Sequence, residues 1–174
     1  TKISLTLLLL KSFSPGEPGS SWIHAGNLQY SSRRWTISWQ HEYVGKNFIA
    51  ESGYIPRKNY IKTNLLASRL FFPGKGKVVS HGPRFVSTYY FTPALKETDH
   101  ENLLLYLVNF RNQSVFDVWA GEVFIELQQP FDPTNSGKDT LARGSRHSWK
   151  AVGVEFFSKP QSRFTYSFST RFGG

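Results

Sequence analysis

The segment from residue 33 to residue 45 alternates between apolar and polar side chains almost without a break. The apolar set is Trp35, Ile37, Trp39 and Tyr43, and the polar set between them is Thr36, Ser38, Gln40 and Glu42. Because successive side chains of a β-strand point to opposite faces, this period of two predicts a strand with one apolar and one polar face. Soluble β-sandwiches and membrane β-barrels both use such strands. What each face contacts therefore decides what the chain does.

Similar segments follow one another along the whole chain. The candidate strands are residues 2–13, 21–31, 34–44, 60–72, 77–92, 102–111, 114–129, 147–158 and 162–172. An average soluble strand has about five or six residues, and a tilted strand needs about nine to eleven to cross a bilayer. Most of the candidates reach the second length. Strand length therefore favours a membrane-crossing sheet over an ordinary sandwich.

Short turns alternate with longer connections between these strands. Turns rich in Pro, Gly, Ser and Asn lie at 15–19, 31–33, 73–76, 111–114 and 159–161, and the longer connections are 45–59 and 130–146. This arrangement is typical of an up-and-down meander with one tight rim and one elaborate rim. We therefore predict an all-β fold, an antiparallel up-and-down meander of about nine strands that is part of a transmembrane β-barrel. Residues 1–174 would form a single segment of that larger barrel domain.

The alternation also predicts which side chains face lipid and which face the lumen. The lipid-facing set is Trp35, Ile37, Trp39, Val123, Ile125, Phe164, Tyr166 and Phe168. The lumen-facing set is Thr36, Ser38, Gln40, Glu42, Glu122, Glu126, Ser167 and Ser169. Aromatic residues make up 16% of the chain, and such residues gather where a barrel meets the membrane interface. Residues 7–10 and 103–108 are apolar at both parities, which fits a buried strand or a contact with a plug.

Composition excludes several classes of function. The chain has no cysteine, so thiol catalysis, disulfides and zinc thiolates are ruled out. No apolar run is long enough for a transmembrane helix, and we interpret residues 3–10 as a strand and not as a signal-peptide core, because no small-residue cleavage site follows. The net charge of +9 would suit nucleic acid, lipopolysaccharide or an acidic glycan. Since the charges are scattered, we expect solvated loops and no nucleic-acid partner.

No catalytic or metal-binding motif is present in the sequence. The five histidines, His24, His41, His81, His100 and His147, are far apart, and no metal spacing links them. Glu97, Asp99 and Glu101 are interpreted as a hydrophilic loop in preference to a calcium site. Glu122 and Glu126 would lie about 13 Å apart on one strand, farther than a glycosidase carboxylate pair. We expect no enzymatic activity, no cofactor and no metal.

One long segment resembles a known family. Tyr43, Val44 and Gly45 end a strand, an Asn-Phe pair follows at 47–48, and Gly-Tyr-Ile-Pro-Arg occupies 53–57. A second match is the loop at 129–137, followed by a strand containing Trp149 and an aromatic strand that closes on two glycines. These features resemble the C-terminal outer-membrane-type β-barrel domain, of unknown function, in proteins of Bacteroidota that carry an N-terminal carbohydrate-binding-module-like sandwich. The resemblance covers most of the chain from Ser21 onward.

The resemblance implies a location and a set of partners. It implies the bacterial outer membrane, with outer-membrane lipid, the remainder of the same barrel or other envelope proteins, and a glycan as partners. The chain lacks the sandwich and further strands of that family, so it looks like an internal segment of the barrel. The expected role is structural or binding, within a protein that serves transport, envelope assembly or glycan handling.

Two other functions remain open from the sequence. A soluble carbohydrate-binding β-sandwich would stack sugar rings on its tryptophans, Trp22, Trp35, Trp39 and Trp149. A glycosidase would use Glu122 or Glu126 together with a carboxylate from a neighbouring strand.

The segment with the strongest resemblance is also the candidate structural or binding loop. Its candidate residues are Gly53, Tyr54, Pro56 and Arg57. Gly53 has access to backbone angles closed to other residues, and Pro56 restricts both itself and the residue before it. We predict an ordered loop that folds back over the lumen or rim, pinned by an ion pair from Arg57 to Glu51 or Glu42; the alternative is an acidic ligand.

Overall fold

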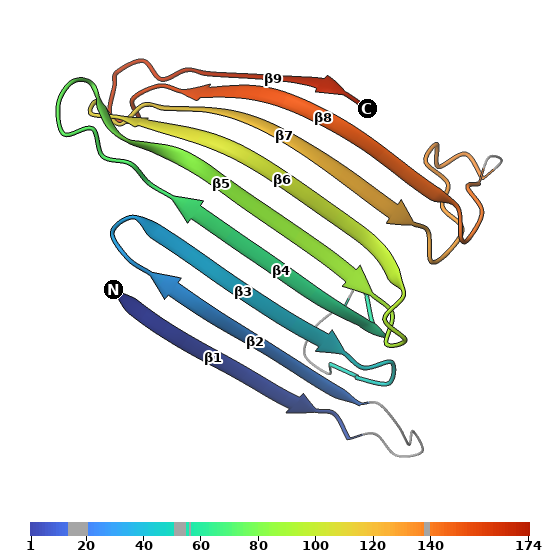
Figure 1. The fold of residues 1–174 in the computed structure, drawn as a ribbon. Helices are drawn as coiled ribbons and strands as arrows, with labels where there is room; N and C mark the ends of the chain where they lie inside the picture. Colours follow the sequence, from blue (N-terminus) through green and yellow to red (C-terminus); the bar gives the residue numbers. More distant parts are fainter. Residues whose placement is uncertain (14–20, 51–54, 56, 138–139) are drawn as a thin grey trace.

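The structure is a computed structural model that describes residues 1–13, 21–50, 55, 57–137 and 140–174. These residues form one sheet of nine antiparallel strands. The strands are β1 (Lys2–Lys11), β2 (Trp22–Ser31), β3 (Trp35–Val44), β4 (Tyr60–Arg69), β5 (Val78–Phe91), β6 (Glu97–Phe110), β7 (Val115–Glu126), β8 (Arg146–Phe157) and β9 (Ser167–Gly173). Each strand pairs with its neighbours in sequence order (Figure 1). The predicted all-β meander is confirmed, and the described residues form one layer, not the two packed sheets of a sandwich.

Two predicted strand starts are wrong by five residues. Strand β6 begins at Glu97, five residues before the predicted start, so Glu97, Asp99 and Glu101 lie in a strand and not in a hydrophilic loop. Strand β9 begins only at Ser167, which leaves Phe164 and Tyr166 in the connection before it. The charged residues at 97–101 suggested a loop, and the alternating residues at 162–166 suggested a strand. In both places hydrogen bonding to the neighbouring strand decides where the strand begins.

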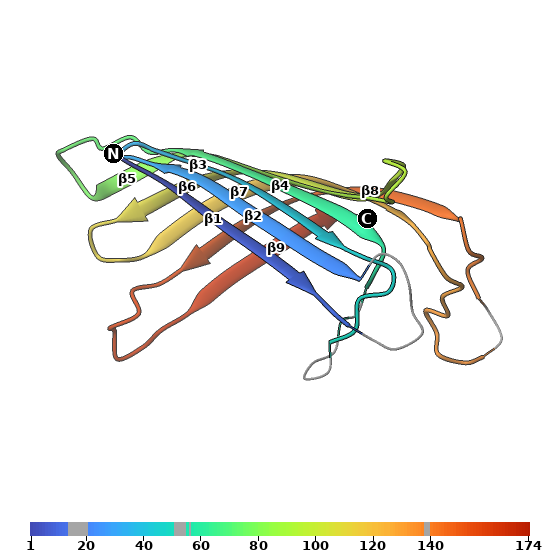
Figure 2. The ribbon, with the colours of Figure 1, turned by 90° about the horizontal axis from the view of Figure 1, so that it is seen from below.

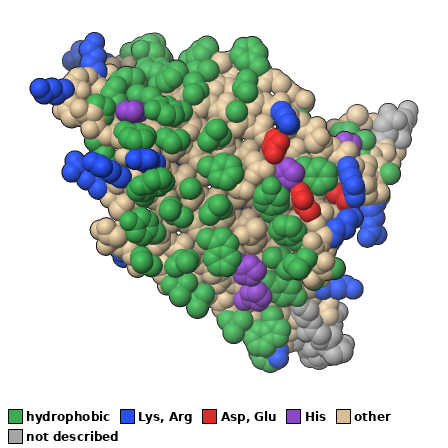
Figure 3. Space-filling view, in the orientation of Figure 1, with side chains coloured by type: hydrophobic (Ala, Val, Ile, Leu, Met, Phe, Trp, Pro, Cys, Tyr) green, Lys and Arg blue, Asp and Glu red, His purple; other side chains and the backbone are tan. Residues whose placement is uncertain are grey.

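The sheet is arched, and its two faces differ in character. In Figure 2 the middle strands lie highest and the edge strands β1 and β9 lie lower on the same side. The convex face is the one turned to the viewer in Figures 1 and 3, and apolar side chains cover most of it. Since residues paired across two strands share a face, the register assigns every strand residue to the convex or the concave side.

Strand β3 has the faces that its sequence predicts. Trp39 pairs with Leu28 on one side and Leu65 on the other, and all three lie on the convex face. Trp35 and Ile37 share that face, while Thr36, Ser38, Gln40 and Glu42 lie on the concave face. Neighbouring polar residues satisfy one another there, since the Ser38 hydroxyl donates to Asn27 Oδ1 at 3.0 Å.

Strand β7 has the opposite faces from those predicted. Val123 pairs with Glu101 and Trp149, and Ile125 pairs with Asp99, so both apolar side chains lie on the concave face. Glu122 lies on the convex face instead of facing the lumen. In strand β9, Phe168 is convex and Ser167 and Ser169 are concave, as predicted.

A single arched sheet leaves little room for a core. Among the described residues only Val44, Phe48 and Ala151 are buried hydrophobic residues. The chain exposes 12188 Å² of surface, whereas a compact soluble monomer of this mass would expose about 8,700 Å². Convex side chains such as Leu5, Trp39 and Val152 are 63%, 47% and 52% exposed. An apolar surface of this extent requires another phase or partner to cover it.

Candidate functional site

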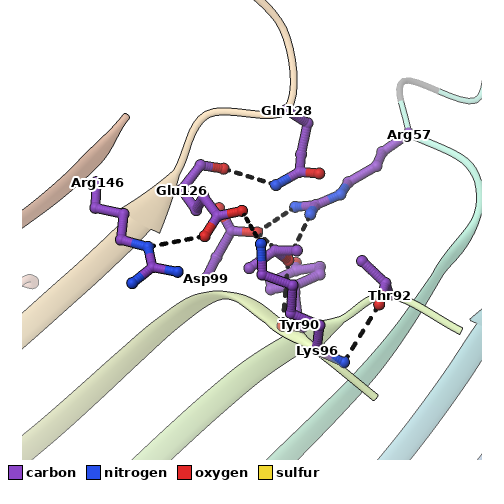
Figure 4. Close-up of polar contacts among 9 residues, drawn as sticks. Arg57, Tyr90, Thr92, Lys96, Asp99, Glu126, Gln128 and Arg146 are labelled. Atoms are coloured by element: carbon purple, nitrogen blue, oxygen red, sulfur yellow. Dashed lines mark hydrogen bonds and ion pairs between the residues drawn. The ribbon is translucent and has the colours of Figure 1, made fainter. Parts of the chain in front are cut away.

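Arg57 lies near the end of the connection between β3 and β4, and its side chain makes contacts on the concave side of the rim that carries the long connections. The Arg57 guanidinium contacts Asp99 Oδ2 at 2.6 Å and donates to Thr98 Oγ1 at 2.8 Å (Figure 4). It also lies over the ring of Tyr90, 5.0 Å from the centroid. Thr98 is 1% exposed, and it is the extra residue of a bulge, since Tyr90 pairs with Asp99 and Phe91 with Glu97. The bulge therefore places two acceptors where a single forked cation can reach both.

Sequence reasoning identified the cation but not its partner. The expected acidic partner is present, but it is Asp99, from a segment predicted to be a loop. Glu42 instead accepts a hydrogen bond from the Tyr60 hydroxyl. Glu51, Gly53, Tyr54 and Pro56 lie outside the described residues. The pairing with Asp99 depends on the order of strands β4, β5 and β6, which no local pattern reveals.

A second ionic cluster joins the same rim on the side of β7 and β8. Glu126 at the end of β7 forms ion pairs with Lys96 and, at 3.0 Å, with Arg146 (Figure 4). The Gln128 side-chain amide donates to the Glu126 carbonyl at 2.9 Å. The Glu126 side chain is only 8% exposed, so it was predicted wrongly as a lumen-lining group. It ties the turn before β6 to the start of β8.

The concave face over β6 to β9 contains a cavity with a volume of 540 Å³. Its defining side chains are Glu101, Asp117, Trp119, Trp149, Glu155 and Arg171. Trp119 lies directly over Gly153, where an added Cβ would come within 2.4 Å of the indole ring. This glycine thus lets the tryptophan lie flat against the sheet, as in aromatic rescue of a strand glycine.

Two carboxylates stand side by side in this cavity. Asp117 pairs directly with Glu155 across β7 and β8, and Asp117 is 8% exposed. Arg171 pairs with Gly153 on the adjacent strand, so one cation lies near the two acids on the same face. Flat indole surfaces beside hydrogen-bonding acids and a guanidinium suit a polar ligand with apolar ring faces. Sequence reasoning missed this group, because only the β7–β8 register brings Asp117 to Glu155.

The convex face carries one polar network among its apolar side chains. Asn102 donates to Glu122 Oε1 at 3.2 Å, and Lys150 Nζ lies 3.8 Å from Glu122 Oε2. His100 contacts Glu97 and lies 4.0 Å from Glu122. Figure 3 shows acidic and histidine side chains together toward the right of this face. The network interrupts the apolar surface on β6 to β8, near the rim of the long connections.

The structure brings two histidines together that are far apart in sequence. His41 Nε2 lies 3.2 Å from His24 Nδ1, and the rings stack with centroids 5.0 Å apart. Within the described ranges, no group of three or more His, Cys, Asp or Glu side chains could hold a metal ion. The pair is therefore a stacked contact on the convex face.

The tryptophans proposed to stack on sugars do not form one platform. Trp22, Trp35 and Trp39 lie on the convex face, and Trp149 lies on the concave face with Trp119. Glu122 and Glu126, the proposed glycosidase residues, belong to two separate ionic clusters. A single sugar could not contact all four tryptophans as a unit.

No family model matches this sequence, and no curated protein or solved structure matches it. In the part of the chain that the structure describes, no helix has the length and apolar character to cross a membrane. Function must therefore be inferred from the faces and rims of the sheet.

Proposed function

We propose that this chain is a wall segment of a bacterial outer-membrane β-barrel, with its convex face in lipid and its concave face lining the lumen. The observation that carries the proposal is the convex surface of a nine-strand arch, on which large apolar side chains are exposed and no described part of the chain covers them. In water such a surface would drive aggregation, whereas the hydrocarbon of a bilayer matches it.

Strand dimensions support the same proposal. Strands β1 to β8 have ten to fourteen residues, which is sufficient for a tilted strand to cross a bilayer. In β1 to β4 the convex face is mostly apolar, and the concave face carries most of the Ser, Thr, Asn and Gln side chains. Backbone groups within the sheet are paired with their neighbours, which is obligatory for structure in lipid.

The two edges of the sheet need further strands under this proposal. Among the described residues, β1 pairs only with β2 and β9 only with β8. Exposed backbone groups at these edges would be costly in hydrocarbon. We infer that the remainder of the same barrel, or another envelope protein, supplies strands that pair with β1 and β9.

The chain contains its own reporters for a test of lipid contact. Single-tryptophan variants that retain Trp39 on the convex face or Trp149 on the concave face would be inserted into phosphatidylcholine vesicles with brominated acyl chains. Bromine quenches indole fluorescence on contact, so Trp39 should be quenched strongly and Trp149 weakly. Equal quenching of the two would contradict the assignment of the faces. Absence of quenching for both would contradict the membrane proposal.

Among the roles of a whole barrel, glycan handling has one specific observation in its favour. The concave cavity places Trp119 and Trp149 beside Asp117, Glu155 and Arg171. Titration of the inserted protein with soluble oligosaccharides, read from Trp149 fluorescence, should show saturable binding that the Arg171→Gln variant weakens. No change in fluorescence with neutral or acidic oligosaccharides would remove this role.

A further inference from the structure

Four turns, which connect β2 to β3, β4 to β5, β6 to β7 and β8 to β9, carry positive charges at one end of the sheet. These turns are residues 32–34, 70–77, 111–114 and 158–166, and they lie along the left end of the strands in Figure 1. We call this end the short-turn rim. Their charged residues are Arg33, Arg34, Lys75, Lys77, Arg111, Lys159 and Arg163, and the four turns contain no Asp or Glu. We call these seven residues the basic collar. The sheet therefore has one rim at which every charged turn residue is a cation.

Among the described residues, the collar cations have no acidic partners. All seven residues are exposed, and none of them takes part in an ion pair with another described residue. The Arg111 guanidinium donates to the carbonyls of Gly74 and Gly76 at 3.1 and 2.6 Å, and Arg33 lies 5.3 Å from the ring centroid of Phe72. These contacts hold two turns in place without neutralising any charge.

At the opposite rim some cations are paired with acids, whereas Lys11, Lys46, Lys58 and Arg143 form no ion pair with a described residue. Arg57 is paired with Asp99, and Lys96 and Arg146 are paired with Glu126. Asp132 adds an acid to the connection between β7 and β8. The short-turn rim thus has seven turn cations and no turn acid, whereas the opposite rim mixes cations with acids.

Aromatic side chains lie at the same rim as the collar. Trp35 begins β3 directly after the first short turn, and the Arg69 guanidinium lies 5.1 Å from its ring centroid. Arg69 also lies 4.8 Å from the centroid of Phe71. Tyr166 and Phe164, in the last short turn, are 56% and 74% exposed. Aromatic rings next to cations at the border of an apolar band match the level of lipid headgroups.

We propose that the basic collar binds the phosphate groups of anionic phospholipids in the leaflet at the short-turn rim. This inference rests on the proposed function, because it requires the convex face to be in a bilayer. Lys and Arg near an anionic membrane surface are attracted to it, and forked guanidinium groups bind phosphate by two hydrogen bonds. The collar also gives the segment a preferred orientation, since the opposite rim has acids as well as cations.

Two tryptophans at opposite rims of the convex face provide the test. One variant retains only Trp35, at the collar, and the other only Trp22, which begins β2 at the long-connection rim. Each is inserted into mixed vesicles of phosphatidylglycerol and phosphatidylcholine in which only one of the two lipids is brominated. Brominated phosphatidylglycerol should quench Trp35 more than brominated phosphatidylcholine does, with an apparent local enrichment of about fivefold, the effect of roughly one cation at such a surface. Trp22 should show a weaker preference, because a single cation, Lys11, lies over its ring at 5.0 Å from the centroid.

Neutralising the collar and screening it should have the same effect. Replacing the seven cations by glutamine should abolish the preference of Trp35 for phosphatidylglycerol, while Lys46→Gln and Lys58→Gln at the other rim should leave it unchanged. In 1 M NaCl, where the screening length is about 3 Å, the unmodified collar should lose the preference as well. The salt measurement needs no substitution, so it decides the matter even where the glutamine variant fails to insert.

The outcomes separate this inference from the function on which it rests. Equal quenching of Trp35 by both brominated lipids would overturn lipid selection by the collar and leave the membrane proposal intact. No quenching of Trp35 or Trp22 by either lipid would overturn both. A preference that persists in 1 M NaCl would overturn the electrostatic basis of the inference.

Discussion

Strands β1 to β4 and strands β6 to β8 use their two faces in different ways. In the first group the convex face is mostly apolar, and the concave face carries small polar side chains such as Ser38 and Asn27. In the second group the convex face carries the network around Glu122, and the concave face carries Trp119 and Trp149. One continuous sheet therefore combines a region with a mostly apolar convex face and a region whose concave face carries large aromatic side chains.

The difference shows where a two-residue period is informative. In β3 one parity is largely apolar and the other polar, so this strand reveals its own orientation. In β7 both parities contain apolar residues, and only pairing with β6 decides that Val123 and Ile125 are concave. The cavity on the concave face depends on this departure from simple alternation, because it places apolar rings beside the polar side chains of that face.

The largest expected effect tests lipid contact in the first group against the second. Ile37→Arg would place a charge on the convex face and should lower the free energy of unfolding in phosphatidylcholine vesicles by about 2 to 4 kcal/mol. Ser38→Arg, one residue away on the concave face, should cost much less. Ile125→Arg should resemble Ser38→Arg, since Ile125 is concave and pairs with Asp99. Urea unfolding of the three variants measures this, and a large cost at Ile125 would show that β7 faces lipid.

The next effect concerns the packing of the concave cavity. Gly153→Ala would bring a methyl group to within 2.4 Å of the Trp119 ring, so we expect a loss of about 1 to 3 kcal/mol in unfolding free energy from overpacking. Trp119→Ala in the same chain should relieve the clash, and the double variant should lose less than the sum of the two single losses. Strict additivity in this cycle would mean that Trp119 does not lie on Gly153.

Loss of the loop anchor should have a smaller effect. Arg57→Gln removes the ion pair to Asp99, but the two side chains are 33% and 19% exposed. Solvent screening should limit the cost to about 1 kcal/mol. The Asn59 amide, which donates to the Val44 carbonyl, should exchange its hydrogen faster in this variant. Lys58→Gln is the matched control, and equal exchange rates in both variants would exclude Arg57 as the pin.

The smallest effect is a pH dependence in the connection between β7 and β8. Hydrogen bonds from the Thr134 hydroxyl and from the backbone amides of Gly137 and Thr134 lower the pKa of Asp132 below its ordinary value. A lowered pKa means that this contribution is complete above the ordinary pKa of Asp and disappears as pH falls through the folded pKa. Amide exchange at Thr134 should increase only at strongly acidic pH. Asp132→Asn should remove that dependence, and a transition near neutral pH would contradict the assignment.

Strand positions could largely be read from the sequence, whereas the candidate sites could not. Strand β3 was predicted within a residue at its start and to the residue at its end, because Trp35, Ile37 and Trp39 alternate with polar neighbours. Arg57 was identified as a pin, because its segment combines glycine, proline and a forked cation. Its partner Asp99, however, lies two strands away, and the cavity around Asp117 and Glu155 joins residues that share no local pattern.

The amino-acid sequence by itself determined the strand-and-turn order of this protein and the orientation of β3, because side-chain alternation and turn chemistry act between near neighbours. Tertiary structure alone decided the orientation of β7, the partner of Arg57, the concave cavity and the assembly of the basic collar. These four features depend on the register between strands and on which turns share a rim. Register is set by hydrogen bonding and side-chain packing across the whole sheet, so no single segment contains the information.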